Sequence, residues 1–297
     1  MVSADILASQ FVIAVMFGLT YFVVALGLSL YFGILGVINF AHGEFYALGA
    51  YIALPVIAVT ASIPVIGGFW SALIAVPLIL GIAGVAIERP LRTVYDRDPL
   101  IVLLLTFGFA VVIREVIQLI WGTSPLSLSQ PEILVGQVNI SGVTVPIYWI
   151  FVLAITAILT AGVFFVFRRT RYGLYLRAAS YDRELLSMFA IDKWRLYTVT
   201  FSVSVALAGL AGLLIAPIRG LNPFMGVEII IIAFVVIIVG GLGSVTGTLI
   251  ASFIMGFTRV YSSLLIPEFG DLPIFILLII MLLLRPEGIM GESGRVH

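Results

Sequence analysis

Two long stretches without any formally charged side chain constrain this chain more than any other feature. No Asp, Glu, Lys or Arg occurs between Asp5 and Glu44, or between Glu44 and Glu88. Similar apolar runs recur to the end of the sequence, and each is long enough for a helix of about 20 residues that crosses a bilayer. Charged residues make up 10% of the chain, against roughly 25% in soluble domains. The sequence therefore predicts an integral membrane protein.

The continuity of the apolar runs predicts the fold class. A backbone inside hydrocarbon must satisfy its own hydrogen bonds, which only helices and closed barrels achieve. Continuous runs favour helices, because barrel strands alternate apolar and polar residues. We predict an all-α polytopic membrane protein with eight or nine transmembrane helices, some of them broken or short. The predicted passes are 6–31, 40–59, 69–88, 99–121, 147–167, 196–216, 226–241, 245–264 and 272–284, with 40–59 and 226–241 as short or re-entrant candidates.

The distribution of basic residues predicts the orientation. The segments 88–98 and 168–195 hold three and seven Lys or Arg residues, whereas 60–68, 122–146 and 265–271 hold none. Basic residues gather in the cytoplasmic loops of membrane proteins. We therefore predict that the two basic loops and the C-terminus are cytoplasmic and that, with nine passes, the N-terminus is outside.

The longest loop without basic residues, 122–146, is rich in Ser, Gly and Pro and contains short β-branched stretches. Such a pattern is typical of a hairpin with polar turns. We predict a small external cap with a strand pair. The sequence leaves open whether this loop is a docking surface or a plain connection between two helices.

The sequence lacks the residues or motifs that several kinds of catalytic and metal-binding site require. The chain has no cysteine, which excludes disulfides, thiolate metal sites and cysteine catalysis. It contains no H-E-x-x-H and no G-x-S-x-G. The one lysine, Lys193, follows Asp192 and precedes Trp194, so the chain cannot form a Walker A loop. Net charge is zero, which gives no indication of nucleic acid binding. We predict no catalytic residues, metal or cofactor, and any ATP-driven step must use another subunit.

The cytoplasmic segment 168–195 contains a predicted short helix, 178–191. An amphipathic helix between two spans can lie along the membrane surface or enter a groove on a cytoplasmic partner. It can equally pack on its own bundle, and the pattern alone does not separate these. The apolar patch consists of Leu185, Leu186, Phe189 and Ala190, and the polar residues are Arg177, Asp182, Arg183 and Glu184.

A polar cluster, Asn39 to Glu44, interrupts the apolar sequence. Gly33 and Gly36 offer places to break a helix, and Asn39 is a suitable N-cap for a new one. Glu44 then lies near a helix N-terminus, where the dipole favours an anion. One interpretation is a capped helix start inside the protein. The other is that the broken helix lines a passage, with His42 and Glu44 facing the bundle interior. Two residues apart on a helix, they point in different directions, so Glu44 needs backbone amides or another helix as its partner.

A second, similar stretch begins at Asn222. Residues 222–228 read NPFMGVE and residues 39–44 read NFAHGE, so both have Asn, Gly and Glu in order at the start of a short apolar helix. Inverted repeats with interrupted helices are typical of transporters. The candidate residues of a translocation path are Asn39, His42, Glu44, Asn222 and Glu228.

Four further features have structural interpretations. The glycine-rich stretch 240–247 has no lysine, so we predict a tight turn with close helix approach and not a phosphate site. Arg219, at the end of a span, can extend toward the interface, pair with Glu228 or meet an external partner, and we favour the first. Arg114 and Glu115 are adjacent and do not face each other; each is expected to face another helix or a partner subunit. Arg259 is a candidate partner for Glu115.

Several motifs together resemble one known family. They keep their order and spacing across nearly the whole chain, and they are similar to the LivH-type permeases, which are membrane subunits of branched-chain amino acid ABC importers. One departure is Ala190, where the family usually has Gly. The matching motifs are GVINFAHGEF at 36–45, ERPLR at 88–92, DPLIxxLLTFG at 98–108, RAASxDxxLLSxxAI at 177–191, NP at 222–223, GGLGSVxG at 240–247 and RPxGIxG at 285–291.

The resemblance implies a fold and a set of partners. It implies a single permease domain over 1–297 with a fold like that of type II ABC importers, an external loop at 122–146 and a coupling loop at 168–195. It implies a second, LivM-like permease subunit, two cytoplasmic ATPase subunits and an extracytoplasmic substrate-binding protein. The location implied is the lipid bilayer of a bacterial or archaeal plasma (inner) membrane. The candidate ATPase-coupling residues are Arg177, Asp182, Glu184, Leu186, Phe189 and Ile191.

Three functions remain open from the sequence. The first is a permease subunit for branched-chain amino acids, delivered by a binding protein. The second is the same machine carrying urea or short amides, because related permeases share these motifs. The third is a self-sufficient secondary transporter or channel, which would need a coupling-ion site of buried carboxylates.

Overall fold

A computed structural model describes residues 4–63, 67–95, 97–140, 143–181, 186 and 191–291. Its internal contacts divide the chain into two compact units. Unit 1 comprises residues 1–29, 130–164 and 232–297, and unit 2 comprises residues 30–129 and 165–231. Three helices, α1, α5 and α9, continue from one unit into the other.

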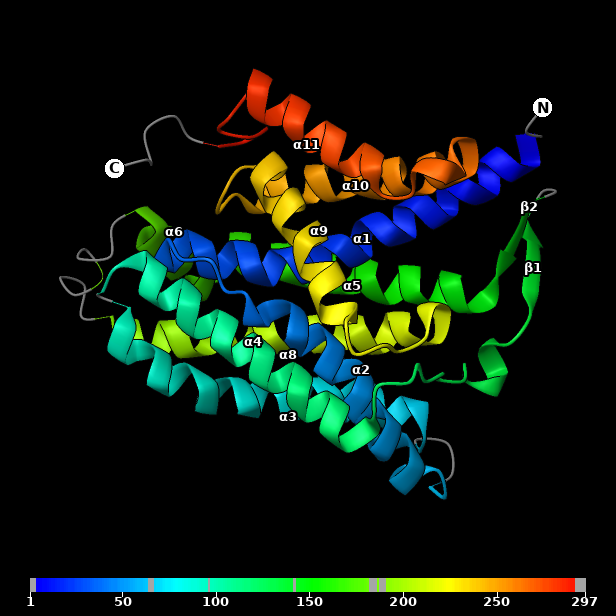
Figure 1. Ribbon diagram of the computed structural model, residues 1–297, viewed down its shortest axis with the longest axis horizontal. Helices are drawn as coiled ribbons and strands as arrows, with labels where there is room; N and C mark the ends of the chain where they lie inside the picture. Colours follow the sequence, from blue (N-terminus) through cyan, green and yellow to red (C-terminus); the bar gives the residue numbers. More distant parts are fainter. Residues whose placement is uncertain are drawn as a thin grey trace. The chain divides into compact units, whose positions relative to one another are not determined.

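The described chain is mostly helical, and every predicted pass corresponds to one helix (Figure 1). The prediction of an all-α polytopic protein is confirmed. In the described residues, seven helices are long and apolar enough to cross a membrane: α1 (Ala4–Leu35), α2 (Ala41–Thr60), α3 (Phe69–Leu91), α4 (Pro99–Trp121), α5 (Ile147–Arg169), α8 (Lys193–Arg219) and α10 (Val245–Leu265). Two apolar helices are shorter, α9 (Met225–Gly240) and α11 (Leu272–Leu284). Single 3-10 turns occur at η1 (Arg92–Val94), η2 (Glu132–Leu134) and η3 (Pro267–Phe269).

The core of unit 2 is built on close contact between α2 and α8. Helix α8 packs against α2 and α3, and α2 also packs against α3 and α4 (Figure 1). A Cβ added at Gly49 would overlap the backbone of Gly209, and one added at Gly212 would overlap the carbonyl oxygen of Tyr46. Only small residues let two helix backbones approach so closely in a membrane protein. These glycines therefore set the distance between α2 and α8.

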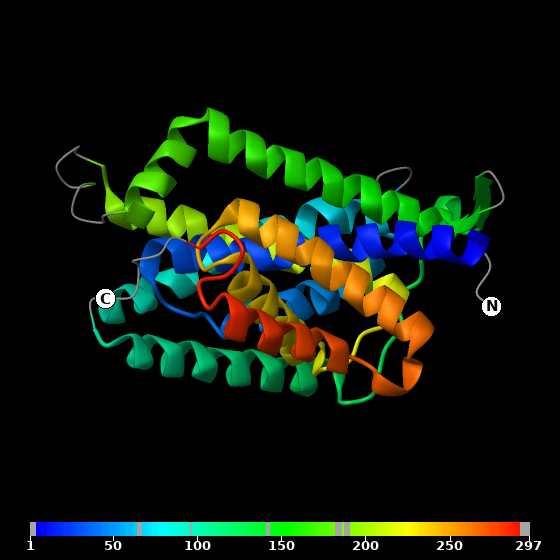
Figure 2. The ribbon, with the colours of Figure 1, turned by 90° about the horizontal axis from the view of Figure 1, so that it is seen from above.

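Unit 1 contains a comparable contact between the first half of α1 and α10, which lie side by side in both views (Figures 1 and 2). A Cβ added at Gly256 would lie 2.5 Å from the backbone nitrogen of Gly18. The rings of Phe11 and Phe257 meet edge to face at 5.3 Å. Small residues thus bring the backbones together, and aromatic rings fill the space beside them.

The glycine-rich stretch 240–247 is a tight turn between α9 and α10, as predicted. A Cβ added at Gly240 would lie 2.6 Å from the carbonyl carbon of Gly247. The segment after α11 also packs on this turn, because Ile289 donates its backbone N–H to the carbonyl of Val239 at 2.8 Å. Two motifs far apart in sequence, 240–247 and 285–291, therefore form one structural feature of unit 1.

The predicted strand pair in the loop 122–146 is confirmed. Strands β1 (Gln137–Ile140) and β2 (Val143–Pro146) form an antiparallel hairpin in which Val138 lies opposite Val145. Earlier in the loop, Leu126 and Leu221 exchange two backbone hydrogen bonds of 2.9 and 2.8 Å. This bridge ties the loop to the connection between α8 and α9. The external location of the loop stays a prediction.

The predicted start of the cytoplasmic helix at Ala178 is wrong. Helix α6 (Arg171–Tyr181) begins directly after α5. The hydroxyl of Thr170 accepts a hydrogen bond from the N–H of Gly173 at 3.2 Å, which is the contact of a capping threonine at a helix start. This local signal outweighed Gly173, which is a poor helix former. Residues 182–185 and 187–190 of the predicted helix lie outside the described residues.

The glycine contact in unit 2 makes a testable prediction. Gly49→Ala places a methyl group into the backbone of Gly209, so we expect the subunit to lose about 1–3 kcal/mol of stability, as overpacked cores do. The measurement is the thermal unfolding midpoint of the detergent-solubilised protein. Gly108→Ala on α4 is the matched control, because nothing lies within 4 Å of its added Cβ. An unchanged midpoint for Gly49→Ala would contradict the packing described here.

Candidate functional site

The break between α1 and α2 forms the first part of the site. Helix α1 ends at Leu35, and Gly36 follows with a φ of 60°, a conformation that glycine adopts without strain. The side-chain oxygen of Asn39 accepts a hydrogen bond from the N–H of Ala41 at 3.0 Å. Asn39 therefore satisfies a free N–H at the start of α2, as predicted, but the residue at the N-cap position is Phe40.

The second Asn-containing stretch has the same local geometry. The side-chain oxygen of Asn222 accepts from the N–H of Phe224 at 2.9 Å, and its carbonyl accepts from the N–H of Met225 at 3.1 Å. Asn39 makes the same two contacts: its side-chain oxygen accepts from the N–H of Ala41, and its carbonyl accepts from the N–H of His42. The predicted repeat is thus a repeated helix start in the structure.

The two helix starts cross at their glycines. A Cβ added at Gly43 would overlap the carbonyl oxygen of Gly226. A Cβ added at Gly226 would lie 2.6 Å from Oε2 of Glu44 and 2.8 Å from the carbonyl oxygen of Gly43. The first turns of α2 and α9 therefore touch, and the Glu44 carboxylate lies against the first turn of α9. The positive ends of both helix dipoles point toward this place.

Glu44 is buried and has a cationic neighbour on another helix. Its side chain is 2% exposed, and the guanidinium of Arg114 on α4 lies 4.0 Å from its Oε1. The same guanidinium lies 5.8 Å from the centre of the Phe224 ring. Within the described residues, Oε2 of Glu44 has no hydrogen-bond partner. The charged neighbour of Glu44 is therefore Arg114, a residue of another helix, which is one of the two alternatives that the sequence left open.

The start of α2 lies well inside the length of α4. The N–H of Phe40 donates to the hydroxyl of Thr106 at 3.2 Å, and the rings of Tyr51 and Trp121 lie 5.4 Å apart. The two helices therefore run in the same direction, with Phe40 beside the eighth residue of α4. At 1.5 Å per residue, the break lies about 10 Å from the first residue of α4. A broken backbone at such depth occurs where protein covers it or where it lines a cavity.

The other predicted path residues differ in exposure. His42 is 1% exposed; that it lines a passage stays one of two interpretations. Asn222 is half-buried, whereas Glu228 is exposed and does not share the environment of Glu44. Arg219 is exposed at the end of α8, and its extension toward the interface stays a prediction. Arg259, considered as a partner for Glu115, instead pairs with Asp271.

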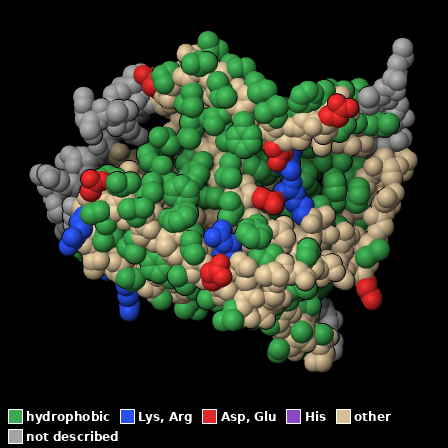
Figure 3. Space-filling view, in the orientation of Figure 1, with side chains coloured by type: hydrophobic (Ala, Val, Ile, Leu, Met, Phe, Trp, Pro, Cys, Tyr) green, Lys and Arg blue, Asp and Glu red, His purple; other side chains and the backbone are tan. Residues whose placement is uncertain are grey.

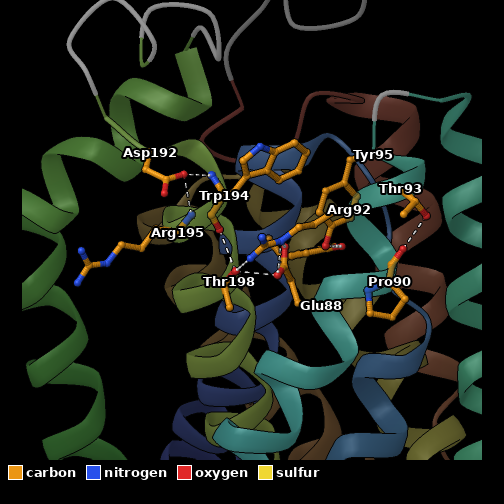
Figure 4. A network of polar contacts seen from close by, with 10 residues as sticks. Glu88, Pro90, Arg92, Thr93, Tyr95, Asp192, Trp194, Arg195 and Thr198 are labelled. Atoms are coloured by element: carbon orange, nitrogen blue, oxygen red, sulfur yellow. Dashed lines mark hydrogen bonds and ion pairs between the residues drawn. The ribbon is translucent and has the colours of Figure 1, made fainter.

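A second polar cluster joins the end of α3 to the start of α8 (Figure 4). Glu88 is fully buried and accepts two hydrogen bonds from Nε of Arg92, at 3.0 and 2.8 Å. The hydroxyl of Thr198 lies 2.7 Å from Oε2 of Glu88 and also contacts the Arg92 guanidinium. Glu88 is thus held by Arg92 in the η1 turn and by Thr198 on α8. The sequence signals for it were the lone carboxylate in the apolar α3 and the motif ERPLR, which contains both Glu88 and Arg92.

Aromatic rings cover this cluster on the side of the loop 168–195. The Arg92 guanidinium lies 5.6 Å from the centre of the Trp194 ring. Tyr95 stacks on Trp194 at 6.5 Å, and its hydroxyl lies 3.1 Å from that of Tyr31. Burial raises the pKa of the Tyr95 phenol well above its ordinary value, so this hydroxyl stays neutral. The side chain of Asp192 caps α8 by accepting from the N–H groups of Trp194 and Arg195.

The sequence profile of one family covers nearly the whole chain. The family is described as "Branched-chain amino acid transport system / permease component", and it matches residues 11–284.

The chain belongs to this permease family.

Three curated relatives show the extent of the similarity. The high-affinity branched-chain amino acid transport system permease protein LivH of Salmonella typhimurium is 32% identical over 292 residues, which cover 93% of this chain and 92% of LivH. The corresponding protein BraD of Pseudomonas aeruginosa is 29% identical over 93% of this chain and 92% of its own length. The permease protein LivM of Salmonella typhimurium is 24% identical over 91% of this chain and 67% of LivM. No solved structure matches the chain.

The candidate coupling residues of this permease differ in their contacts and in their burial. The guanidinium of Arg177 donates to the carbonyl of Phe167 and lies over the ring of the same residue, so Arg177 folds back on the end of α5. Leu186 is 1% exposed, which supports the alternative in which this segment packs on its own bundle. Ile191 is half-buried, and its N–H donates to the carbonyl of Leu186. Asp182, Glu184 and Phe189 lie outside the described residues.

Helix α6 of the permease is attached to α8. The hydroxyls of Tyr172 and Thr200 lie 2.8 Å apart. Burial raises the pKa of the Tyr172 phenol, so it takes part in this hydrogen bond as a neutral group. The start of the loop 168–195 is therefore attached to α8 through Tyr172. Its last residues, from Lys193, are the first turn of α8 itself, which the cluster around Glu88 joins to α3.

The Glu88 cluster makes a testable prediction. Thr198→Val removes the hydroxyl that contacts both Glu88 and Arg92, and we expect a loss of about 1–3 kcal/mol because buried polar groups lose a partner. The measurement is the thermal unfolding midpoint of the solubilised permease. Thr93→Val is the matched control, because the Thr93 hydroxyl is exposed and bonds only the carbonyl of Pro90 among the described residues. Equal midpoints for the two variants would show that the cluster adds no stability.

Proposed function

We propose that this chain is the membrane-spanning permease subunit of an ATP-driven importer for branched-chain amino acids. The observation that carries the proposal is the family match over residues 11–284, together with relatives named for this transport. The chain's single lysine cannot form a Walker A loop, so two cytoplasmic ATPase subunits hydrolyse ATP. A substrate-binding protein delivers the cargo, and a second, LivM-like permease completes the path. The assembly lies in a bacterial or archaeal inner membrane with the C-terminus in the cytoplasm.

The structure gives less support to a self-sufficient secondary transporter. Such a protein needs carboxylates grouped at a coupling-ion site. Glu44 and Glu88 are both buried, but each lies beside an arginine and on a different helix pair. An arginine neighbour already compensates the charge that a coupling cation would compensate. The same machine carrying urea or short amides remains the second candidate, because the cargo is selected mainly by the binding protein.

We propose that the crossing of α2 and α9 flanks the translocation route. Two helix starts meet there inside the length of α4, as in transporters that bind substrate at interrupted helices. Asn39 and Asn222 hold the two starts in shape, and His42, Glu44 and Glu228 are the ionisable groups nearby. For Glu44 we favour an architectural role, because it compensates Arg114 and the positive ends of two helices.

We also propose that the loop 168–195 couples this route to ATP hydrolysis. The loop joins two spanning helices: Tyr172 near its start bonds Thr200 of α8, and its end runs directly into α8. A force applied to the loop by an ATPase would therefore reach α8 and, through the glycine contacts, α2. Phe189 is the apolar residue we assign to the ATPase contact.

The test of the proposed function is uptake into proteoliposomes. The purified complex contains this permease, the second permease and the ATPases, and the binding protein is added outside. We expect uptake of labelled leucine that requires both ATP inside and binding protein outside, and a Phe189→Asp permease that assembles but does not couple. Uptake without ATP would favour the secondary transporter, and uptake of urea in place of leucine would favour the second candidate.

The role of Glu44 makes a separate prediction. Glu44→Gln keeps the size of the side chain, so we expect near-normal yield and uptake. Glu44→Leu leaves Arg114 without its carboxylate, and we expect a loss of about 1–3 kcal/mol of stability. Glu228→Leu is the control for stability, because Glu228 is the acidic residue in the first turn of α9 but is exposed. A well-assembled Glu44→Gln variant without uptake would instead assign Glu44 to transport itself.

A further inference from the structure

Helix α4 buries one face and exposes the other. The buried residues Val102, Thr106, Ala110 and Ile117 recur with helical spacing on the side that packs in unit 2. Three apolar residues on the other side, Leu104, Val112 and Leu119, are 59, 59 and 86% exposed. Figure 3 shows hydrophobic side chains over most of the surface at α4, with acidic and basic groups among them.

An acidic residue lies on the exposed side at depth. Glu115 is exposed, and at 1.5 Å per residue it lies about 24 Å from the first residue of α4 and about 9 Å from the last. It lines an open, shallow depression on the face of α4 together with five neighbours of the same helix. We call these six residues the Glu115 face: Val111, Val112, Glu115, Val116, Gln118 and Leu119.

The charge of Glu115 is not compensated within the described part of the chain. No ion pair of the described residues includes Glu115. Its neighbour Arg114 is directed to Glu44 and the Phe224 ring, and adjacent residues on a helix do not face each other. Carboxylates inside a membrane are costly and are found against protein or water. A lipid-facing location for the Glu115 face is therefore unfavourable.

We propose that the Glu115 face packs against the second, LivM-like permease chain, which supplies a basic side chain to Glu115. The proposal rests on the proposed function, because it requires a second permease in the assembly. The occupant must be embedded in the membrane, because the face lies within the length of a spanning helix. Four of the six lining residues are Val or Leu, which suit a packed helix better than a water-filled path.

Charge argues for a different chain over a second copy of this one. A symmetric dimer places the same patch of both subunits in contact. The six residues of the Glu115 face include one acid and no base, so self-association would bring two carboxylates together inside the membrane. A different permease with an Arg or Lys at that depth resolves the repulsion.

The test uses a photo-activated cross-linking residue in the assembled complex. The residue p-benzoylphenylalanine is incorporated at Val112 or Leu119 of the permease, in membranes that also contain the second permease, the ATPases and the binding protein. Matched controls carry it at Leu78 or Ile82 of α3, which are 61 and 72% exposed on a helix face without charge. Adducts are identified by peptide mass spectrometry. We expect adducts with the second permease from the α4 positions and with lipid from the α3 positions.

Charge reversal provides the second measurement. We expect Glu115→Lys to lose the second permease from the purified complex, whereas Glu132→Lys, at an exposed acid in the loop after α4, keeps it. Adducts from α4 with lipid alone, with a second copy of this chain or with the chain itself would overturn the proposal. If leucine uptake is normal and the adducts are lipid alone, only the interface is wrong. If the adducts form but no uptake occurs, the interface stands and the proposed transport function is wrong.

Discussion

Close backbone contact at glycines is the constraint on which unit 2 depends. Helix α2 meets α9 at Gly43 and Gly226, and it meets α8 at Gly49 and Gly209. In a membrane the hydrophobic effect cannot drive helices together, because lipid tails are as apolar as the side chains of the helices. Close packing supplies the attraction instead, and it requires residues without a Cβ in the way. The position of α2, and with it the position of Glu44, follows from these contacts.

The second constraint is the compensation of charge away from water. Glu44 has Arg114 as its neighbour, and Glu88 has Arg92 and Thr198. The two clusters differ in tightness. Arg92 makes direct hydrogen bonds to Glu88. The Arg114 guanidinium lies 4.0 Å from Glu44 and also makes a cation–π contact with the Phe224 ring. The tight cluster suits a fixed joint between α3 and α8, next to the proposed coupling loop, and the looser one suits a place where two helix starts cross.

These features connect the proposed coupling loop with the proposed route. The loop is attached to α8 at its start through Tyr172 and Thr200, and at its end it continues directly into α8, which Thr198 joins to Glu88 of α3. Helix α8 contacts α2 at glycines, and α2 begins at the crossing with α9. One continuous set of packed helices in unit 2 therefore links the loop to the crossing. Rigid elements in direct contact are a physical means of transmitting a displacement.

The sequence alone determined the membrane location, the helical class, the approximate bounds of nine apolar helices and the strand pair in the loop 122–146. These follow from local patterns, because a span needs a continuous apolar run and a helix start needs a polar capping group. The two Asn-containing helix starts were visible for the same reason. The start of α6 was missed because the Thr170 cap competes with a following glycine, and local preferences alone do not decide such a case.

Only the tertiary structure decided which distant residues meet. The pairing of Glu44 with Arg114, of Glu88 with Thr198 and of Gly43 with Gly226 joins positions 70, 110 and 183 residues apart. A helical pattern gives the direction of each side chain relative to its own helix but not the helix that it faces. Glu88 and Glu115 are each the one acidic residue of an apolar helix, yet Glu88 is buried and Glu115 is exposed. Burial depends on the neighbours that each helix acquires when the chain packs, and that information is not local.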